Sequence, residues 1–294
     1  MNELPCGHEE SMGFAFELSL AEYLRKALCR CAFQSFFVKS ALLCWLLLVQ
    51  AVAAVPRTND SNYLDPDFIA RAFTAVVHGR EYAAGSFELS RWPDDIQYYI
   101  HQDVADPLAV VMIEMHLQQL GDISGRRFVK VPIEDARLEI YLTRQQGWQV
   151  LVANRVGASA IPDLHGAVCY ASFNTRSGTI EAAQVFIPVD QARMHGKLVS
   201  CVVEELTQVM GLPNDSELVF PSIFNDRTPD DLLTPLDWVL IRLLYHPDLV
   251  PGMVASQSTT AVRALLRQWQ ADGTLQSAAV KVKQGELYRM LGRR

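Results

Sequence analysis

The sequence predicts an α+β domain in which a mixed sheet packs against one central helix, with further helices at both ends of the chain. Two patterns lead to this fold class. Between residues 96 and 188, short segments of alternating apolar residues follow one another, as strands do, with a longer helical segment among them. Residues 198–210 instead repeat apolar side chains at helical spacing, and Gly211 and Pro213 end this second helix.

Length and charge limit the possible classes of protein. The chain has 294 residues, of which 50% are hydrophobic, so it can hold one large domain with an export segment, or two small domains. Its formal net charge of −7 argues against a nucleic-acid partner, which would need a clustered basic face. We expect a membrane contact only through a leader that stays uncleaved.

Residues 1–54 have the features of an export signal with a long leader. Basic residues precede an apolar run at 41–54, which ends in small residues with Val52 and Ala54 at the −3 and −1 positions. The run is short for a membrane span, which needs about 20 residues. We expect cleavage after Ala54 and an exported protein, periplasmic or secreted. An uncleaved inner-membrane anchor is the alternative.

Cysteine usage agrees with export. Four of the six cysteines lie in the leader and would be lost on cleavage, which leaves Cys169 and Cys201. An even pair in an oxidising compartment predicts one disulfide bond between them. Two separate buried thiols are the alternative.

The segment 55–90 is predicted to contain a polar linker and one helix. This helix begins at Asp65 and Pro66, which suit the N-cap and the first helical position, and it ends at Gly79. A second helix is expected to begin in the same way at Asp106 and Pro107, and to stop at Gly121.

Five strands are predicted before the central helix. They lie at residues 96–101, 128–131, 138–142, 168–173 and 179–188. The last two strands form a hairpin across 174–178, and we expect its second strand, 179–188, near the edge of the sheet. The segment 147–156 fits either a strand or a helix.

Two helices are predicted after the central one. The closing helix has Thr234 as its N-cap and Asp237 at N3, an acidic variant of the capping box, and it ends before Pro247. Residues 259–271 form an amphipathic helix within a C-terminal tail, 248–294, that we expect to be helical.

The central helix carries the run Glu-Glu-x-x-Gln-x-x-Gly-Leu-Pro-Asn-Asp, which begins at Glu204. Its spacing overlays on H-E-x-x-H-x-x-G-x-x-H, the zinc-binding helix of metzincin peptidases. In this overlay Glu204 and Gln208 stand at the two histidines, and Glu205 stands at the general base. Asn214 or Asp215 falls at the third ligand. The run also resembles the hallmark of DUF2927, a family of exported bacterial proteins of unknown function.

These resemblances imply a zincin-like domain over residues 91–247 with an altered metal site. A catalytic zinc needs about three imidazole or carboxylate ligands, and both helix histidines are absent. We therefore expect no stoichiometric zinc and no cofactor, although a set of Glu, Gln and Asn oxygens would suit a harder divalent cation. The expected role is binding or structural, without peptidase activity. An atypical metal-dependent hydrolase that uses Glu205 as its general base is the alternative.

The overlay also predicts where the site lies. We expect a shallow cleft beneath the strand 179–188, with a peptide or protein ligand along the sheet edge, as the resemblance to peptidases implies. Its predicted lining consists of Glu204, Glu205 and Gln208, with Asn214 or Asp215 nearby.

A structural role for the same residues is the other interpretation. Glu204 and Gln208 would then hydrogen-bond the loops around Asn214 and Ser222 and would fix the turn after the helix. Two histidines, His165 and His195, lie in segments that could approach this helix.

Overall fold

The structure, a computed structural model, describes residues 62–79, 87–229 and 231–293. These residues belong to one compact unit, Asp60–Arg294. The expected leader, 1–54, and its cleavage site lie outside the described residues. No helix in the described part of the chain combines the length and the hydropathy that crossing a membrane requires.

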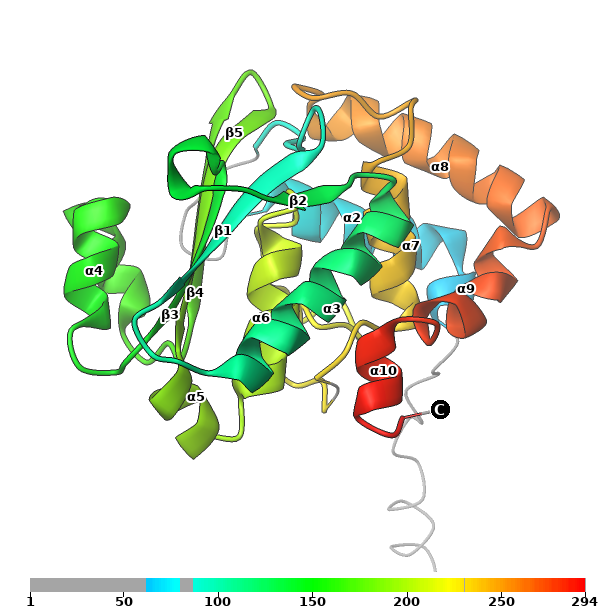
Figure 1. Ribbon diagram of the computed structural model, residues 1–294. Helices are drawn as coiled ribbons and strands as arrows, with labels where there is room; N and C mark the ends of the chain where they lie inside the picture. Colours follow the sequence, from blue (N-terminus) through cyan, green and yellow to red (C-terminus); the bar gives the residue numbers. More distant parts are fainter. Residues whose placement is uncertain (1–61, 80–86, 230, 294) are drawn as a thin grey trace, which may run out of the picture. The chain divides into compact units, whose positions relative to one another are not determined.

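A five-stranded sheet in the order β2-β1-β3-β5-β4 lies at the centre of the fold (Figure 1). The strands are β1 (Ile96–Gln102), β2 (Phe128–Lys130), β3 (Leu138–Thr143), β4 (Tyr170–Arg176) and β5 (Thr179–Pro188). Four strands run parallel, whereas β4 runs antiparallel to β5 and forms one edge. The prediction that 179–188 lies near the edge is corrected, because β5 lies between β3 and β4.

Burial explains why β5 is an interior strand. Val185 belongs to the main core and Phe186 to a second cluster on the opposite face, so β5 is covered on both sides. β4 contains no fully buried residue, and it ends in the exposed Thr175 and Arg176. A polar, partly exposed strand is the kind that tolerates an edge position.

The β4–β5 hairpin closes through a shorter turn than expected. Ser177 and Gly178 both have positive φ angles, 50° and 75°, as the central residues of a two-residue hairpin turn do. A Cβ atom on Gly178 would lie 2.0 Å from the backbone nitrogen of Gly252. Glycine is therefore required at this point, where the hairpin meets the chain before α8.

Helices make up most of the remaining described chain. The α-helices are α2 (Pro66–His78), α3 (Pro107–Ser124), α4 (Trp148–Arg155), α5 (Val189–Met194), α6 (Leu198–Gln208), α7 (Pro235–Leu244), α8 (Ala255–Ala271), α9 (Thr274–Val282) and α10 (Glu286–Met290). Short 3-10 helices occur at η1 (Asn62–Leu64), η2 (Ile133–Asp135) and η3 (Ala158–Leu164).

The predicted N-caps are confirmed. The side chains of Asp65, Asp106 and Thr234 each accept a hydrogen bond from a backbone N–H in the first turn of their helix. At α7 the capping box is reciprocal, because the Asp237 carboxylate also accepts from the backbone nitrogen of Thr234 at 2.6 Å.

One predicted helix end is wrong, and one ambiguous segment is resolved. α3 continues through Gly121 and ends at Gly125, whose φ of 73° is the left-handed conformation of a C-terminal cap. Gly121 serves close packing instead, since a Cβ there would lie 2.9 Å from the Arg126 carbonyl oxygen. The segment 147–156 forms α4, which covers the second face of the sheet together with η3.

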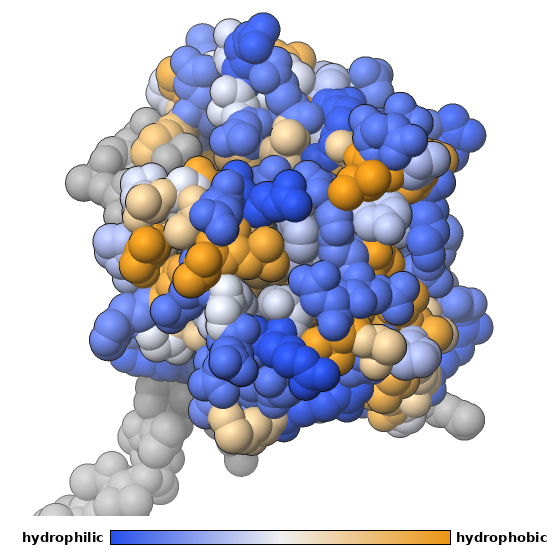
Figure 2. Space-filling model, turned by 60° about the vertical axis from the view of Figure 1, so that its left-hand side comes forward, coloured by the Kyte–Doolittle hydropathy of each residue, from blue (hydrophilic) through white to orange (hydrophobic). Residues whose placement is uncertain are grey.

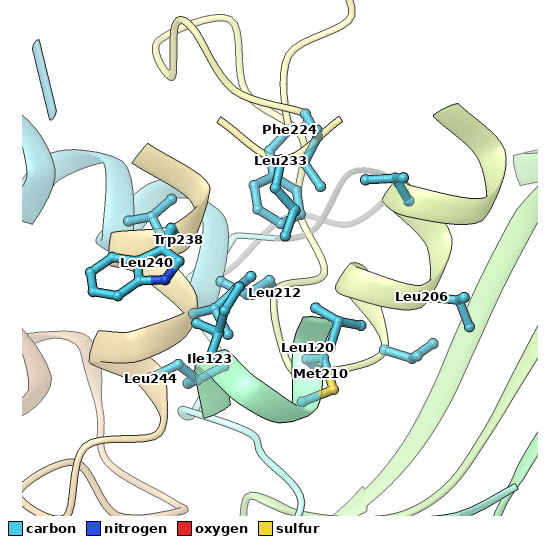
Figure 3. Close-up of a cluster of buried hydrophobic side chains, with 14 of the residues drawn as sticks. Leu120, Ile123, Leu206, Met210, Leu212, Phe224, Leu233, Trp238, Leu240 and Leu244 are labelled. Carbon is cyan, nitrogen blue, oxygen red and sulfur yellow. The ribbon is translucent and has the colours of Figure 1, made fainter. Parts of the chain in front are cut away.

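The main core lies between the other face of the sheet and α3, α6 and α7 (Figures 1 and 3). Leu120 from α3, Leu206 from α6 and Leu240 from α7 are fully buried within it. At its centre the His116 ring of α3 lies 3.0 Å from the Thr207 hydroxyl of α6. Burial lowers the pKa of His116 to about 4, so it is neutral at physiological pH. These contacts fix α6 and hence the face that it turns outward.

Candidate functional site

A cleft of about 650 Å³ lies between α6 and the edge strand β4. One wall is residues 163–173, which lead into and form the first half of β4. The other wall is the outward face of α6, and Pro213, Asp215 and Asp226 from the following loops complete the lining. The expected cleft beneath 179–188 is thus displaced by one strand, because no β5 residue is among its lining.

The outward face of α6 supplies the acidic character of the cleft. Glu204, Glu205 and Gln208 all line it, whereas Val203 and Leu206 point into the core. Glu205 and Gln208 are buried, with 6% and 8% of each residue exposed. The helical spacing of the apolar residues produces this division directly.

Three carboxylates of the cleft lining converge. Glu204, Asp215 and Asp226 each offer an oxygen atom, and these atoms lie within 4.8 Å of one another. The Gln208 side-chain amide donates a hydrogen bond of 3.3 Å to Oδ1 of Asp215. Burial, followed by the negative charges of Glu205 and Asp215, raises the pKa of Glu204 well above its usual range.

This cluster could hold a divalent cation. Its donors are carboxylate oxygens, which suit hard cations such as Ca²⁺ or Mg²⁺ better than zinc. A cation would also offset the mutual repulsion of the three carboxylates, as a proton on Glu204 does. The donor set therefore fits either a metal ion or the positive side chain of a ligand.

Asn214 lies outside the cleft, although the sequence overlay allowed it as a ligand. Its side-chain amide donates to the Ala75 carbonyl oxygen at 2.9 Å, and its backbone nitrogen donates to Val76 at 3.2 Å. Asn214 therefore ties the turn after α6 to the last turn of α2.

Gly211 has φ 108° and approaches Ser90 so closely that a Cβ would lie 1.9 Å from the Ser90 carbonyl oxygen.

The predicted disulfide bond between Cys169 and Cys201 is present in the structure. The two Cα atoms lie 5.8 Å apart, within the usual range for a disulfide. Both cysteines line the cleft, one just before β4 and the other in α6. The bond therefore links the two walls and limits how far they can separate.

The loop that carries Asp226 is held in place by hydrogen bonds to a buried carboxylate of α7. Asp237 accepts from the Ser222 hydroxyl at 2.5 Å and from the Ile223 backbone nitrogen at 3.2 Å. Burial raises the pKa of Asp237 to about 6, against the opposing effect of these hydrogen bonds. The structural interpretation expected α6 to hydrogen-bond the loop around Ser222. Ser222 instead anchors this loop to α7.

Sequence reasoning missed several lining residues. Asp163, Tyr170, Lys197 and Asp226 all face the cleft, and none belongs to the recognised run. Asp226 follows α6 by 18 positions in an irregular loop, and no periodic pattern signals where such a residue will lie. Of the two histidines considered, His165 lines the cleft, whereas His195 caps α5 and is not part of the lining.

Residues 66–264 match the model of a family described as "Protein of unknown function (DUF2927)". The chain belongs to this family. The match includes α2 and most of α8, so the DUF2927 region is longer than the domain expected at 91–247. No curated protein and no solved structure matched the chain.

Figure 2 shows one face of the molecule, on which hydrophobic residues form several separate patches among hydrophilic ones. No single large apolar area dominates this face. This face therefore offers no broad apolar surface for a partner.

Proposed function

We propose that this DUF2927 protein is a zincin-like binding protein whose cleft holds an extended peptide segment beside β4 without hydrolysing it. The order of strand, helix, further strands and central helix is that of metzincins, and the run from Glu204 to Asp215 lies where their active-site helix would be. Both points support the zincin-like assignment.

The position of β4 carries the proposal. Within the described residues β4 pairs only with β5, so its other edge has no strand partner. An extended peptide can bind such an edge through backbone hydrogen bonds, and side-chain pockets then provide specificity. Because Glu204, Asp215 and Asp226 lie beside this edge, a peptide with a lysine or arginine is the best match in charge.

Two features favour binding over hydrolysis. The two histidines of the metzincin helix are replaced by Glu204 and Gln208, and the Gln208 amide donates to Asp215, one of the two candidates for the third ligand in the overlay. A site of this kind lacks the imidazole ligands that hold catalytic zinc. We therefore expect neither stoichiometric zinc nor general peptidase activity.

Export remains part of the proposal. The leader pattern at 1–54 supports it, and so does the Cys169–Cys201 disulfide bond, because disulfide bonds persist mainly in oxidising compartments. Mass spectrometry of protein recovered from the periplasm or the medium should give a new N-terminus at Val55. Recovery of intact leader in the membrane fraction would favour the anchored alternative.

A metal-dependent hydrolase is the second candidate, and one observation favours it. The three carboxylates that could hold a cation converge beside Glu205, which stands at the general-base position of the overlay and is largely buried. A cation at this cluster could lower the pKa of a bound water, and Glu205 could then accept its proton.

Peptides methylated on the backbone nitrogen test the proposed binding mode. In an antiparallel pair only every second residue exchanges hydrogen bonds with the neighbouring strand. We therefore expect a lysine-containing extended peptide to bind the protein lacking residues 1–54. Methylation of one alternate set of amides should weaken binding about tenfold or more, whereas methylation of the other set should be tolerated.

The two methylated sets control for each other, because they have the same composition and charge. Fluorescence anisotropy of labelled peptides measures both. Equal effects of the two sets would contradict strand addition to β4, and failure of every extended peptide to bind would contradict the proposed function.

A further inference from the structure

A second cavity lies among helices on the side of the core away from the sheet. It has a volume of about 310 Å³ and is formed by the last turns of α3, by α7 and by α9 with the residues after it. Trp238 is part of its lining, and the side chains of Arg242 and Lys281 add positive charge to it. This cavity shares no residue with the acidic cleft.

Arg242 is held in place by aromatic rings and not by an ion pair. Its guanidinium carbon lies 5.3 Å from the Trp238 ring centroid and 5.8 Å from the Trp269 centroid. Indole rings orient a guanidinium group but do not neutralise it. Among the described residues, no carboxylate lies within ion-pair distance of Arg242.

Lys281 adds a second positive charge from the last turn of α9. It is exposed, and it too forms no ion pair within the described part of the chain. The one carboxylate in the lining, Asp122, accepts a hydrogen bond of 2.9 Å from Gln118. Asp272 lies outside the lining and accepts from the backbone nitrogen and hydroxyl of Thr274; these bonds lower its pKa, and the positive charge of Arg242 contributes to the same shift. Two cations therefore face the cavity against one lining carboxylate.

The C-terminal tail completes this cavity. Gln119 of α3 donates to the Val282 carbonyl oxygen at 2.8 Å, and Gly285 packs directly against the Gln119 side chain. These contacts hold α9 and the following turn against α3. Because the family match ends at residue 264, the wall from Thr274 to Gly285 lies outside the matched region. The cavity thus joins family residues to a segment beyond them.

We propose that this cavity binds a small molecule with a dianionic group, either a phosphate monoester or a dicarboxylate. A guanidinium presents two parallel N–H donors that match two anionic oxygens, and an ammonium group acts as a second point charge. The volume is within the range of small-molecule sites, so the ligand can extend beyond its charged group. The proposal specifies the charge of the ligand, and the experiment below distinguishes a phosphate group from a dicarboxylate.

Calorimetric titration with inorganic phosphate and with succinate, at constant ionic strength, tests the proposal. We expect at least one of the two anions to bind the purified protein, and the tryptophan fluorescence to change, because Trp238 and Trp269 contact Arg242. Arg242→Gln and Lys281→Gln should each weaken binding about tenfold. Arg267→Gln removes an exposed cation of α8 that does not line the cavity, and it should leave affinity unchanged.

Lys281→Gln keeps the test decisive if Arg242→Gln destabilises the helices, since Lys281 is exposed and makes no ring contact. Preference for phosphate over succinate, or the reverse, identifies the source of the dianion. Absence of binding by both anions would overturn the proposal. Equal affinity in the wild type, Lys281→Gln and Arg267→Gln would overturn it as well, because binding would then be nonspecific.

Discussion

The side-chain amide of Gln208 donates a hydrogen bond to the carboxylate of Asp215 across the turn that ends α6, at 3.3 Å. In the metzincin overlay Gln208 stands at the second histidine, and the third ligand falls at Asn214 or Asp215. Here Gln208 and Asp215 contact each other, and Glu204 and Asp226 complete a cluster of oxygen donors. The turn after α6 therefore brings together carboxylate and amide groups, where the overlay would require imidazoles for zinc.

Glu204→Gln should stabilise the protein at high pH. Because the folded-state pKa of Glu204 is raised, the stability that its proton provides is present at low pH and is lost as pH rises. The variant and the wild type should be equally stable below about pH 4, where glutamate is protonated in both states. At pH 8 the variant should be more stable by about 1 kcal/mol, as is common when a strained functional group is removed.

Urea denaturation at both pH values, with chelator present, measures this difference. A matched control is Glu217→Gln, which removes an exposed carboxylate outside the cluster and should show no comparable pH dependence. A Glu204→Gln variant that is less stable than the wild type at pH 8 would show that the carboxylate contributes favourable contacts instead.

Removal of the disulfide should loosen the cleft as well as the fold. Cys169 and Cys201 are separated by 32 positions, and a loop of this size is typically stabilised by roughly 2–4 kcal/mol. Replacement of both cysteines by serine should lower stability by that amount and weaken peptide binding in protein that is still folded. Ellman titration of the denatured, unreduced protein that lacks residues 1–54 should find no free thiol. Two free thiols would disprove the bond.

Asn214 and Asp215 are adjacent, but mutation of Asn214 should affect stability, whereas mutation of Asp215 should affect peptide binding. Asn214→Ala removes the hydrogen bond to Ala75 and should cost about 1 kcal/mol of stability, with peptide affinity unchanged. Asp215→Asn should weaken binding of a lysine peptide with little loss of stability. Chemical denaturation and anisotropy on the same preparations measure both quantities. A loss of affinity in Asn214→Ala would place Asn214 at the site after all.

Local features of the fold could be predicted from the sequence, because nearby residues determine them. Asp65, Asp106 and Thr234 begin helices through hydrogen bonds to their own first turns, so residue type and spacing suffice. The outward face of α6 follows from helical periodicity in the same way. The helix end at Gly121 was wrong because a glycine can serve close packing as well as a helix stop, and only the neighbour Arg126 distinguishes the two.

Features that depend on distant segments were harder to predict. The edge strand was misassigned because the two hairpin strands differ mainly in what covers them, and the cover of β5 comes from α4 and the core. Asp226 was missed because its position depends on the contacts of Ser222 and Ile223 with Asp237. The disulfide could be predicted because only two cysteines remain after the leader, so that only one pairing was possible.

The most direct test of binding without hydrolysis is mass spectrometry of a lysine-containing peptide after prolonged incubation with the protein. It should be performed with chelator, with Zn²⁺ and with Ca²⁺, using the wild type and Glu205→Gln. We expect the peptide to remain intact in every sample, because the site lacks the imidazole ligands of a catalytic zinc. We also expect both proteins to bind the peptide, because Glu205→Gln removes a general base while nearly preserving the shape of the side chain. Metal-dependent cleavage by the wild type, abolished in a fully folded Glu205→Gln variant, would contradict the proposal and identify a hydrolase.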